Sequence, residues 1–193
     1  MSYMRNKGLS VVIPIFNEAA NIKTLFKKLQ EFSQIAEFPF QFVLVDGCSS
    51  DETPSLIRQE IESYSASYVE LLAMENRGGY GFDIMQGLAM AQYDTLAWTH
   101  ADLQTDLCDL IEGYRILESS ANPSVVKGRR VNRALLERFF TFGMQIYTFF
   151  NLKVYLDDIN AQPKLCKHSF YVEHLNQNPP NDFSLDLFFL LTA

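Results

Sequence analysis

Four short clusters of polar residues and glycines carry the side chains that could do chemistry in this sequence. The clusters span residues 14–18, 46–53, 76–81 and 99–104, and each follows a run of apolar residues. In a parallel sheet, ligands bind beyond the carboxyl ends of the strands. If each apolar run is such a strand, the clusters share one rim, and together they indicate a binding site more strongly than any one alone.

The last cluster, Thr99-His-Ala-Asp-Leu-Gln104, could bind a metal ion. Its alternate residues His100, Asp102 and Gln104 point the same way if the segment is extended. An imidazole, a carboxylate and an amide oxygen could hold a divalent cation, which would neutralise a departing diphosphate. The alternative is a histidine that only hydrogen-bonds in the core.

The second cluster begins with Asp46, directly after the apolar run Phe42-Val-Leu-Val45. A carboxylate at a strand end can accept a hydrogen bond from the ring N–H of uracil or guanine. The alternative is a common Ser/Asp turn over residues 46–51. Asp46 favours the first interpretation, because a buried acid without a partner would be costly.

The first and third clusters also allow structural explanations. Asn17 and Glu18 could contact a ligand, or Asn17 could cap a helix whose first turn Glu18 favours. The segment Asn76-Arg-Gly-Gly-Tyr-Gly81 could let the backbone approach a diphosphate, or could form a tight turn. The first cluster lacks the glycines of a dinucleotide-binding turn and the Gly-Lys pair of a P-loop, which counts against both motifs.

The elements that must position these clusters alternate between strand and helix. Apolar runs predict strands, and apolar residues at helical spacing predict the helices between them. The predicted strands are residues 9–14, 42–45, 69–74 and 95–99, and the predicted helices are residues 22–32, a helix capped by Thr53 and started by Pro54, and residues 84–91 and 107–117. Four alternations predict an α/β fold with a mostly parallel, Rossmann-like sheet and helices on both faces.

Length and composition restrict the class of protein. The 193 residues suit a single domain, 1–193, in which a change of pattern near Ser124 separates residues 1–123 from residues 124–193. The net charge of −7 counts against nucleic-acid binding. The three widely spaced cysteines suit a reducing compartment. No signal peptide and no run of the roughly 18–20 apolar residues that span a membrane is found, so we expect a cytoplasmic protein, soluble or peripheral to a membrane.

The combined motifs resemble those of family 2 glycosyltransferases, which have the GT-A fold. The resemblance rests on the order and spacing of Val-Ile-Pro-Ile-Phe-Asn-Glu18, Val-Asp-Gly-Cys-Ser-Ser-Asp-Glu-Thr53, Asn-Arg-Gly-Gly-Tyr-Gly81 and His-Ala-Asp-Leu-Gln104. The Ala-Asp-Leu-Gln form is similar to that of dolichyl- and polyprenyl-phosphate mannosyl- or glucosyltransferases. The resemblance implies a nucleoside-diphosphate sugar as donor, either a GDP- or a UDP-hexose.

The resemblance also implies roles for individual residues. The implied donor-binding residues are Pro14, Asn17, Glu18, Asp46, Asp51, Asn76, Gly79, Gly81 and Lys164. Asp102 and Gln104, with His100, would bind a divalent cation, and Arg129 would lie near the phosphates. His100 replaces the first acid of an Asp-x-Asp pair, which favours Mn²⁺ over Mg²⁺. Gly47 stands where relatives have a second acid.

The second half of the chain is expected to bind the acceptor. Five basic residues cluster near its start, namely Lys127, Arg129, Arg130, Arg133 and Arg138, and the aromatic-rich segment 139–150 follows them. This arrangement suits an anionic membrane surface or a site for a lipid phosphate, and the alternative is a core helix after a solvated basic turn. Relatives usually continue past the position of Ala193 into another strand and a membrane-proximal segment, so we expect a domain truncated at its C-terminus.

Two further segments contain candidate acids. Residues 157–165 resemble the family's acceptor loop, in which Asp158 matches the acid and Lys164 the base. Residues 181–186 open a predicted final helix, where Asp182 is an active-site acid or an N-terminal cap. The predicted catalytic residues are Asp102, Arg129, Asp158 and Asp182.

The expected reaction is the transfer of a hexose, with inversion, to a polyprenyl phosphate or a glycan. A lipid phosphate is already ionised, whereas a sugar hydroxyl would need a carboxylate base such as Asp158 or Asp182. One alternative is a nucleotidyltransferase, which should carry a glycine-rich loop with Arg and Lys after the first strand, and this chain has none. The other alternative is a non-catalytic module that binds nucleotide sugars, which Gly47 and His100 favour.

Overall fold

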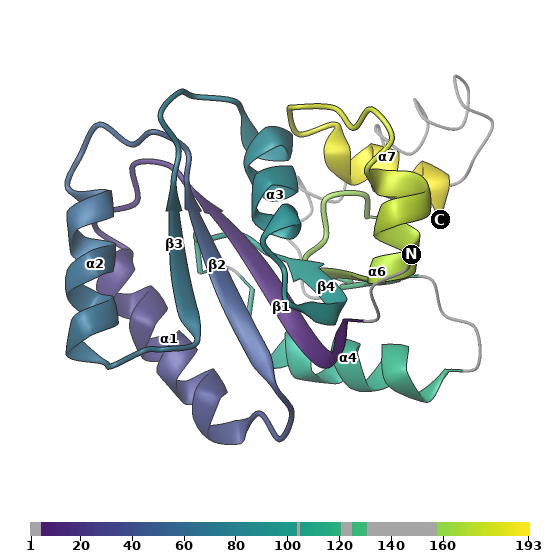
Figure 1. Ribbon diagram of the computed structural model, residues 1–193, viewed down its shortest axis with the longest axis horizontal. Coiled ribbons are helices and arrows are strands. Elements are labelled where there is room, and N and C mark those ends of the chain that lie inside the picture. Colours follow the sequence, from purple (N-terminus) through teal and green to yellow (C-terminus); the bar gives the residue numbers. More distant parts are fainter. Residues whose placement is uncertain (1–4, 104, 121–124, 131–157) are drawn as a thin grey trace.

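The central sheet of this computed structural model has the strand order β3–β2–β1–β4–β6–β5 (Figure 1). The structure describes residues 5–103, 105–120, 125–130 and 158–193. The strands are β1 (Asn6–Ile15), β2 (Phe40–Asp46), β3 (Val69–Ala73), β4 (Tyr93–Trp98), β5 (Val125–Lys127) and β6 (Lys164–Lys167). The four predicted strands are all present, as β1 to β4.

The first four strands form the parallel part of the sheet. β1 pairs with β2 on one side and with β4 on the other, and β2 pairs with β3. Val11, Val12 and Ile13 of β1 have no exposed surface. A strand that is covered on both faces needs a continuous apolar run, and this explains the sequence of β1.

Helices cover both faces of the sheet, as predicted (Figure 1). Apolar side chains of α1 (Ile22–Ile35), α2 (Thr53–Ser63) and α4 (Cys108–Ser119) share one core with alternate residues of β1. Those of α3 (Tyr80–Ala89) and α7 (Leu185–Thr192) share the core on the other face with Val12. The short helix α6 (His168–Phe170) and the π-helical turn η1 (Tyr171–Leu175) also belong to this second core.

The sheet becomes antiparallel at the β5 edge. β6 pairs antiparallel with β4, and β5 pairs antiparallel with β6. Residues beyond Ser124 therefore extend the sheet that the first half begins. The sheet is mostly parallel with helices on both faces, so the predicted fold class is confirmed.

No helix in the described part of the chain is both long enough and apolar enough to cross a bilayer. The longest helix in the described part of the chain, α1, buries Ile22, Leu25, Phe26, Leu29 and Phe32 on a single stripe. A stripe of this kind belongs to a helix that packs on a sheet with its other side in water.

The loops after β1 and β2 are tied to each other at the carboxyl edge. The backbone N–H of Asn17 donates to Ser49 Oγ at 2.8 Å, and Asn17 Oδ1 accepts the N–H of Ser50 at 2.9 Å. The N–H of Glu18 donates to Thr53 Oγ1 at 2.9 Å. These bonds hold the two loops together where the first two predicted clusters meet.

The structure excludes the alternative role of Asn17 as a helix cap and shows that the predicted cap of the second helix is wrong. α1 begins at Ile22 with Asn21 at its N-cap, so Asn17 and Glu18 precede the helix and do not form its cap or first turn. α2 begins at Thr53, and Glu52 takes the N-cap position predicted for Thr53. In both places the polar side chains bond between loops instead of to the nearest helix end.

Candidate functional site

A pocket of about 450 Å³ lies at the carboxyl edge of the parallel strands. It draws on the ends of β1, β2 and β4 and on the start of α3, which is where ligands of such sheets bind. Its lining residues are Pro14, Ile15, Phe16, Glu18, Gly47, Arg77, Gly79, Tyr80, Asp83, His100, Ala101, Asp102 and Phe183. Residues of all four predicted clusters therefore reach one pocket.

Two buried carboxyl groups approach each other at the β2 end of the pocket. Asp46, the last residue of β2, is 2% exposed, and Asp83 of α3 is 6% exposed. The Oδ1 atoms of both have no hydrogen-bond partner among the described residues. Burial and the charge of Asp46 raise the pKa of Asp83 to about 6, against the influence of Arg77. Asp46 Oδ2 accepts the backbone N–H of Ser49 at 3.3 Å, so what needs an explanation is the pair of buried Oδ1 atoms, because a buried polar atom without a partner is costly.

Aromatic rings line two other sides of the pocket. Tyr80 stacks between His100, with ring centroids 5.3 Å apart, and Phe183, with centroids 4.5 Å apart. On another side the Arg77 guanidinium lies 3.9 Å from the centroid of the Phe16 ring. The pocket thus combines flat apolar surfaces with a cation and with acids, as sites for nucleotides and other small molecules do.

The residues predicted to bind a metal are only partly described. His100 and Asp102 both line the pocket, whereas Gln104 lies outside the described residues. Burial lowers the pKa of His100, although the nearby charges of Asp186 and Asp102 oppose the shift. Among described residues, no group of three or more His, Cys, Asp or Glu side chains is arranged to hold a metal ion. His100 and Asp102 could still supply two ligands.

Some of the remaining residues of the first two clusters line the pocket, and others hold together the loops that form it. Pro14 and Glu18 line the pocket, while Asn17 and Asp51 do not. The Asp51 carboxylate accepts hydrogen bonds from the backbone N–H groups of Thr53 at 3.0 Å and Ala19 at 3.3 Å. Hydrogen bonding to Thr53 lowers the pKa of Asp51. Asn17 and Asp51 thus bridge the loops, and their contact with a donor stays a prediction.

The glycine-rich cluster packs against the loop before α7. The backbone of Gly79 has a φ of 102°, and a Cβ there would lie 2.5 Å from the carbonyl oxygen of Asn181. Gly81 N–H donates to that same oxygen at 2.9 Å. Gly79 also lines the pocket, whereas Asn76 is exposed and does not. The glycines therefore permit a close approach of protein backbone, and their contact with a diphosphate remains a prediction.

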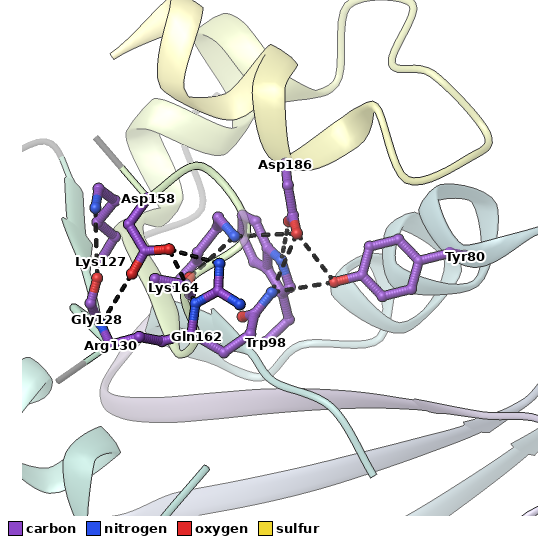
Figure 2. Close-up of polar contacts among 10 residues, drawn as sticks. Tyr80, Trp98, Lys127, Gly128, Arg130, Asp158, Gln162, Lys164 and Asp186 are labelled. Carbon is purple, nitrogen blue, oxygen red and sulfur yellow. Dashed lines mark hydrogen bonds and ion pairs between the residues drawn. The ribbon is translucent and has the colours of Figure 1, made fainter. Parts of the chain in front are cut away.

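Lys164 is at the centre of a buried polar network (Figure 2). Its ammonium group is fully buried, lies 3.0 Å from Asp186 Oδ2 and donates to the carbonyl oxygen of Ala161 at 3.1 Å. Burial lowers the pKa of Lys164, and the charge of Asp186 opposes this shift. Lys164 was expected to bind the donor, but its ammonium group is engaged inside the protein and does not line the pocket.

Asp186 connects this network to the pocket wall (Figure 2). Its Oδ1 accepts from Trp98 Nε1 at 3.1 Å, and its Oδ2 accepts from Gln162 Nε2 at 3.2 Å. The Tyr80 hydroxyl lies 3.5 Å from Oδ2 and also accepts from Gln162 at 3.2 Å. Burial raises the pKa of Tyr80. Asp186 of α7 therefore fixes the position of the Tyr80 ring, which stacks on His100.

Three predicted catalytic residues lie away from the pocket lining. Arg129 lines a second, smaller cavity of about 220 Å³ beside α4. Asp158 is 3% exposed and accepts hydrogen bonds from the backbone and side chain of Arg130 (Figure 2). Asp182 Oδ1 accepts from the N–H of Ser184 at 2.9 Å, and this bonding lowers its pKa. Their catalytic roles stay predictions, and the position of Asp182 is that of a residue that stabilises the turn into α7.

Several pocket residues escaped the sequence analysis. Arg77 and Tyr80 lie within a glycine motif whose glycines drew attention, and Asp83 lies on an apolar helix. Phe183 is 69% exposed and reaches the pocket from a loop more than 100 residues later in the chain than Arg77. Of these residues, only Asp83 could have been found from the sequence, because an acid among the apolar residues of α3 is unusual. Arg133, Arg138 and the segment 139–150 lie outside the described residues.

The chain is similar to enzymes that act on undecaprenyl phosphate. It is 29% identical over 98 residues to an undecaprenyl-phosphate 4-deoxy-4-formamido-L-arabinose transferase of Pseudomonas syringae, covering 51% of this chain and 29% of that protein. It is also 29% identical over 133 residues to the enzyme of the same name from Photorhabdus laumondii, covering 69% and 40%. The matched regions thus span less than half of these relatives.

Solved structures with the same fold are glycosyltransferases of the GT-A type. A mannosyltransferase from Pyrobaculum calidifontis, in complex with GDP-Man and Mn²⁺, superimposes with a TM-score of 0.68 at 19% identity, covering 96% of this chain and 50% of that one. Glucosyl-3-phosphoglycerate synthase from Mycobacterium tuberculosis gives 0.63 at 14% identity, covering 86% and 58%. These likenesses establish the fold.

The family follows from the match of the chain itself. The sequence profile described as glycosyl transferase family 2 matches residues 10–159, which include the four clusters and most of the strands that carry them. That range is well over half of the 193 residues. The chain therefore belongs to glycosyl transferase family 2.

Proposed function

We propose that this chain binds a nucleoside-diphosphate sugar and belongs to an enzyme that transfers the glycosyl group to a polyprenyl phosphate. The observation that carries the proposal is the pocket itself. In a chain of this family, Asp46, Arg77 and Asp102 stand around the carboxyl edge of a parallel sheet, with His100 beside them. Together they offer acceptors for a base and a cation for a diphosphate.

The base is proposed to lie at the β2 end of the pocket. There Asp46 would accept the ring N–H of uracil or guanine, and Pro14 and Glu18 would lie beside the base and ribose. Arg77 would face the diphosphate, because a guanidinium can form paired hydrogen bonds with phosphate oxygens. Solved structures of this fold include complexes with each base: the Pyrobaculum enzyme holds GDP-Man, and Staphylococcus aureus TarS has been solved with UDP-GlcNAc.

A divalent cation fits the side of the pocket formed by His100 and Asp102. An imidazole and a carboxylate are both ordinary ligands, and the imidazole favours Mn²⁺ over Mg²⁺. When bound, the ion would neutralise charge that develops on the leaving nucleoside diphosphate. Gln104 is the third proposed ligand. His100 keeps its ring plane fixed by stacking on Tyr80, which would limit the cost of orienting it.

The acceptor is proposed to be a polyprenyl phosphate, in line with the names of the curated relatives. Its phosphate oxygen would attack the anomeric carbon from the side opposite the leaving diphosphate, with inversion. Because that oxygen is already ionised, the reaction needs no strong general base. Asp158, which accepts three hydrogen bonds from Arg130, and Asp182, which accepts two from Ser184, are then free of that task.

We propose the transfer of a glycosyl group without naming the sugar. The expected hexose agrees with GDP-Man in the Pyrobaculum structure, but the curated relatives are named for an arabinose derivative. A lipid acceptor would bring the protein to the inner face of a membrane, where the basic residues 127–138 and the aromatic segment 139–150 are proposed to meet anionic lipid.

The test is transfer of labelled sugar to undecaprenyl phosphate in detergent micelles. A panel of UDP- and GDP-sugars would be supplied with Mn²⁺, with Mg²⁺ or with chelator. We expect label in the lipid fraction with one donor, and a loss on the order of 100-fold in Asp102→Asn, which removes a charged ligand near the leaving group. Glu62→Ala, an exposed acid on α2, is the matched control and should keep the wild-type rate.

The second candidate function is a module that binds nucleotide sugars without transfer. The observation in its favour is that His100, which would be an acid in relatives, is stacked on Tyr80 inside the pocket. Binding of a nucleoside diphosphate together with no labelled lipid, for every donor and cation, would replace our proposal with this one.

A further inference from the structure

Asp83 occupies space that a side chain at position 47 would otherwise fill. A Cβ placed on Gly47 would lie 2.5 Å from Asp83 Oδ2 and 3.3 Å from Asp83 Cγ. The next atom along, the carbonyl oxygen of Ile15, is 3.6 Å away. The obstruction is thus the Asp83 carboxyl group alone, and the backbone of Gly47 is outside the left-handed region that would require glycine.

The position of this carboxyl group is not explained by contacts within the protein. Asp83 lines the pocket but is only 6% exposed, and its Oδ1 lacks a hydrogen-bond partner among the described residues. The Oδ1 atom of its neighbour Asp46 also lacks a partner, although Asp46 Oδ2 accepts the backbone N–H of Ser49 at 3.3 Å. Two carboxyl groups side by side repel each other. The position of Asp83 in the first turn of α3 and the charge of Arg77 favour its ionised form, but they give its Oδ1 no hydrogen-bond donor.

We propose that Asp83 is a specificity-determining residue for the donor base, and that it joins Asp46 in accepting the two adjacent N–H groups of guanine. This inference rests on the proposed binding of a nucleoside diphosphate. The carboxyl group reaches from α3 into the space that Gly47 leaves open, so that a second acid lies beside Asp46 although β2 ends in only one.

The chemistry of the two acids selects a base with a protonated ring nitrogen. Guanine presents a ring N–H next to an exocyclic amino group, so each of the two carboxylates can accept one N–H group. Uracil presents a single ring N–H between two carbonyl oxygens, and one of these oxygens would face the second carboxylate. Adenine and cytosine place an unprotonated ring nitrogen at the corresponding edge, and its lone pair would face the carboxylates. A pocket with two acids is therefore expected to discriminate against ADP and CDP, because mismatched polar groups would be left buried without partners.

The first arm of the test measures nucleotide affinity by calorimetry in the presence of Mn²⁺. Wild type is expected to bind GDP more tightly than UDP, ADP and CDP. In Asp83→Ala the affinity for the preferred nucleotide should fall roughly 10- to 100-fold, the loss of one hydrogen bond to a charged group. Affinity for inorganic pyrophosphate, which has no base, should stay the same or rise slightly, since one negative charge is removed. Glu62→Ala is again the matched control.

The second arm moves the acid back to position 47. Gly47→Asp alone should bind poorly, because the new side chain meets the Asp83 carboxyl group. The double variant with Gly47→Asp and Asp83→Ala should recover base selectivity and most of the affinity, because the carboxylate returns to the same space from the other side.

The outcomes separate this inference from the proposed function. If wild type does not prefer GDP to UDP, or if Asp83→Ala binds GDP as tightly as wild type does, nucleotide binding stands and the role of Asp83 is refuted. If Asp83→Ala loses pyrophosphate and nucleotide alike, and the double variant recovers neither, Asp83 has a structural role only. If wild type binds no nucleoside diphosphate, the proposed function and this inference both fail.

Discussion

Asp83 holds its place in the fold at a cost that can be measured. Its pKa is raised to about 6 by burial and by the charge of Asp46, whereas an unfolded aspartate titrates near about 3.9. Between these two values the folded chain binds more protons than the unfolded chain. The free energy of unfolding therefore falls as the pH rises from about 4 to about 6, and it stays reduced above that range. Such a cost at a pocket is typical of a functional group.

Asp83→Asn is accordingly expected to stabilise the protein near neutral pH. The variant removes the buried charge but keeps the shape of the side chain, so the gain should be about 1–3 kcal/mol at pH 7.5. Urea unfolding at pH 4.5 and 7.5 would measure it, and the difference between variant and wild type should shrink at the lower pH. A difference that does not change with pH would contradict this account, and Glu62→Gln serves as the control.

The sequence predicts a good part of the site at this scale, and the rest depends on packing. Asp46, His100 and Asp102 were found because each directly follows an apolar run at a strand end. Asp83 lies four residues into α3, and only the approach of that helix to Gly47 brings it to the pocket. Lys164 was matched from a motif, but its complete burial beside Asp186 depends on how β6 and α7 meet.

At the scale of elements, the pocket depends on a close contact between α3 and the loop before α7. Gly81 lies in the first turn of α3, and its N–H bonds to the backbone of Asn181. A Cβ on Gly81 would lie 2.8 Å from the carbonyl oxygen of Asp182, which is backbone and cannot rotate away. The contact places Phe183 on the pocket wall next to Tyr80.

Gly81→Ala is expected to separate these two elements. Alanine normally favours a helix interior over glycine by up to about 1 kcal/mol. Here the clash should reverse the sign and cost about 1–3 kcal/mol. Thermal unfolding would show a lower midpoint, and nucleotide binding should weaken because Phe183 shifts. Gln86→Ala, at a half-exposed position of α3, is the control, and an equal or higher midpoint in Gly81→Ala would disprove the clash.

Element types were predictable here because their periodicities were strong, whereas some boundaries were not. The four strands and four helices of the first half follow from apolar runs and helical stripes. α3 begins at Tyr80 instead of Ile84, because Gly79, which suggested a loop, takes the N-cap position and Gly81 lies in the first turn. The antiparallel strands β5 and β6 are three and four residues long, and so short a run carries no period to recognise.

Across the whole molecule, one buried ion pair joins segments that are far apart in the sequence. Lys164 at the start of β6 meets Asp186 of α7, which also accepts from Trp98 at the end of β4 (Figure 2). Tyr80 at the start of α3 completes the connection. The final helix is thus fixed to the sheet by polar contacts inside the second core, in addition to its apolar residues.

Lys164→Met is expected to destabilise the entire protein. It would leave the Asp186 carboxylate buried without its cation, at a cost of about 3–5 kcal/mol. Urea unfolding would measure the loss, and Lys23→Met on the exposed side of α1 should change the free energy of unfolding by no more than about 0.5 kcal/mol. A Lys164→Met variant as stable as wild type would show that the pair contributes no net stability.

The contact between Gly47 and Asp83 also constrains how such a pocket can change over generations. Because the carboxyl group at position 83 fills the space beside position 47, a chain with an acid at both positions must shift one of the two side chains. A lineage that moves the second acid from one position to the other therefore passes either through a crowded ancestor with both acids or through an ancestor with Asp46 alone. Among relatives, a small residue at 83 should therefore accompany an acid at 47, and each arrangement should persist because the path between them runs through a weaker binder.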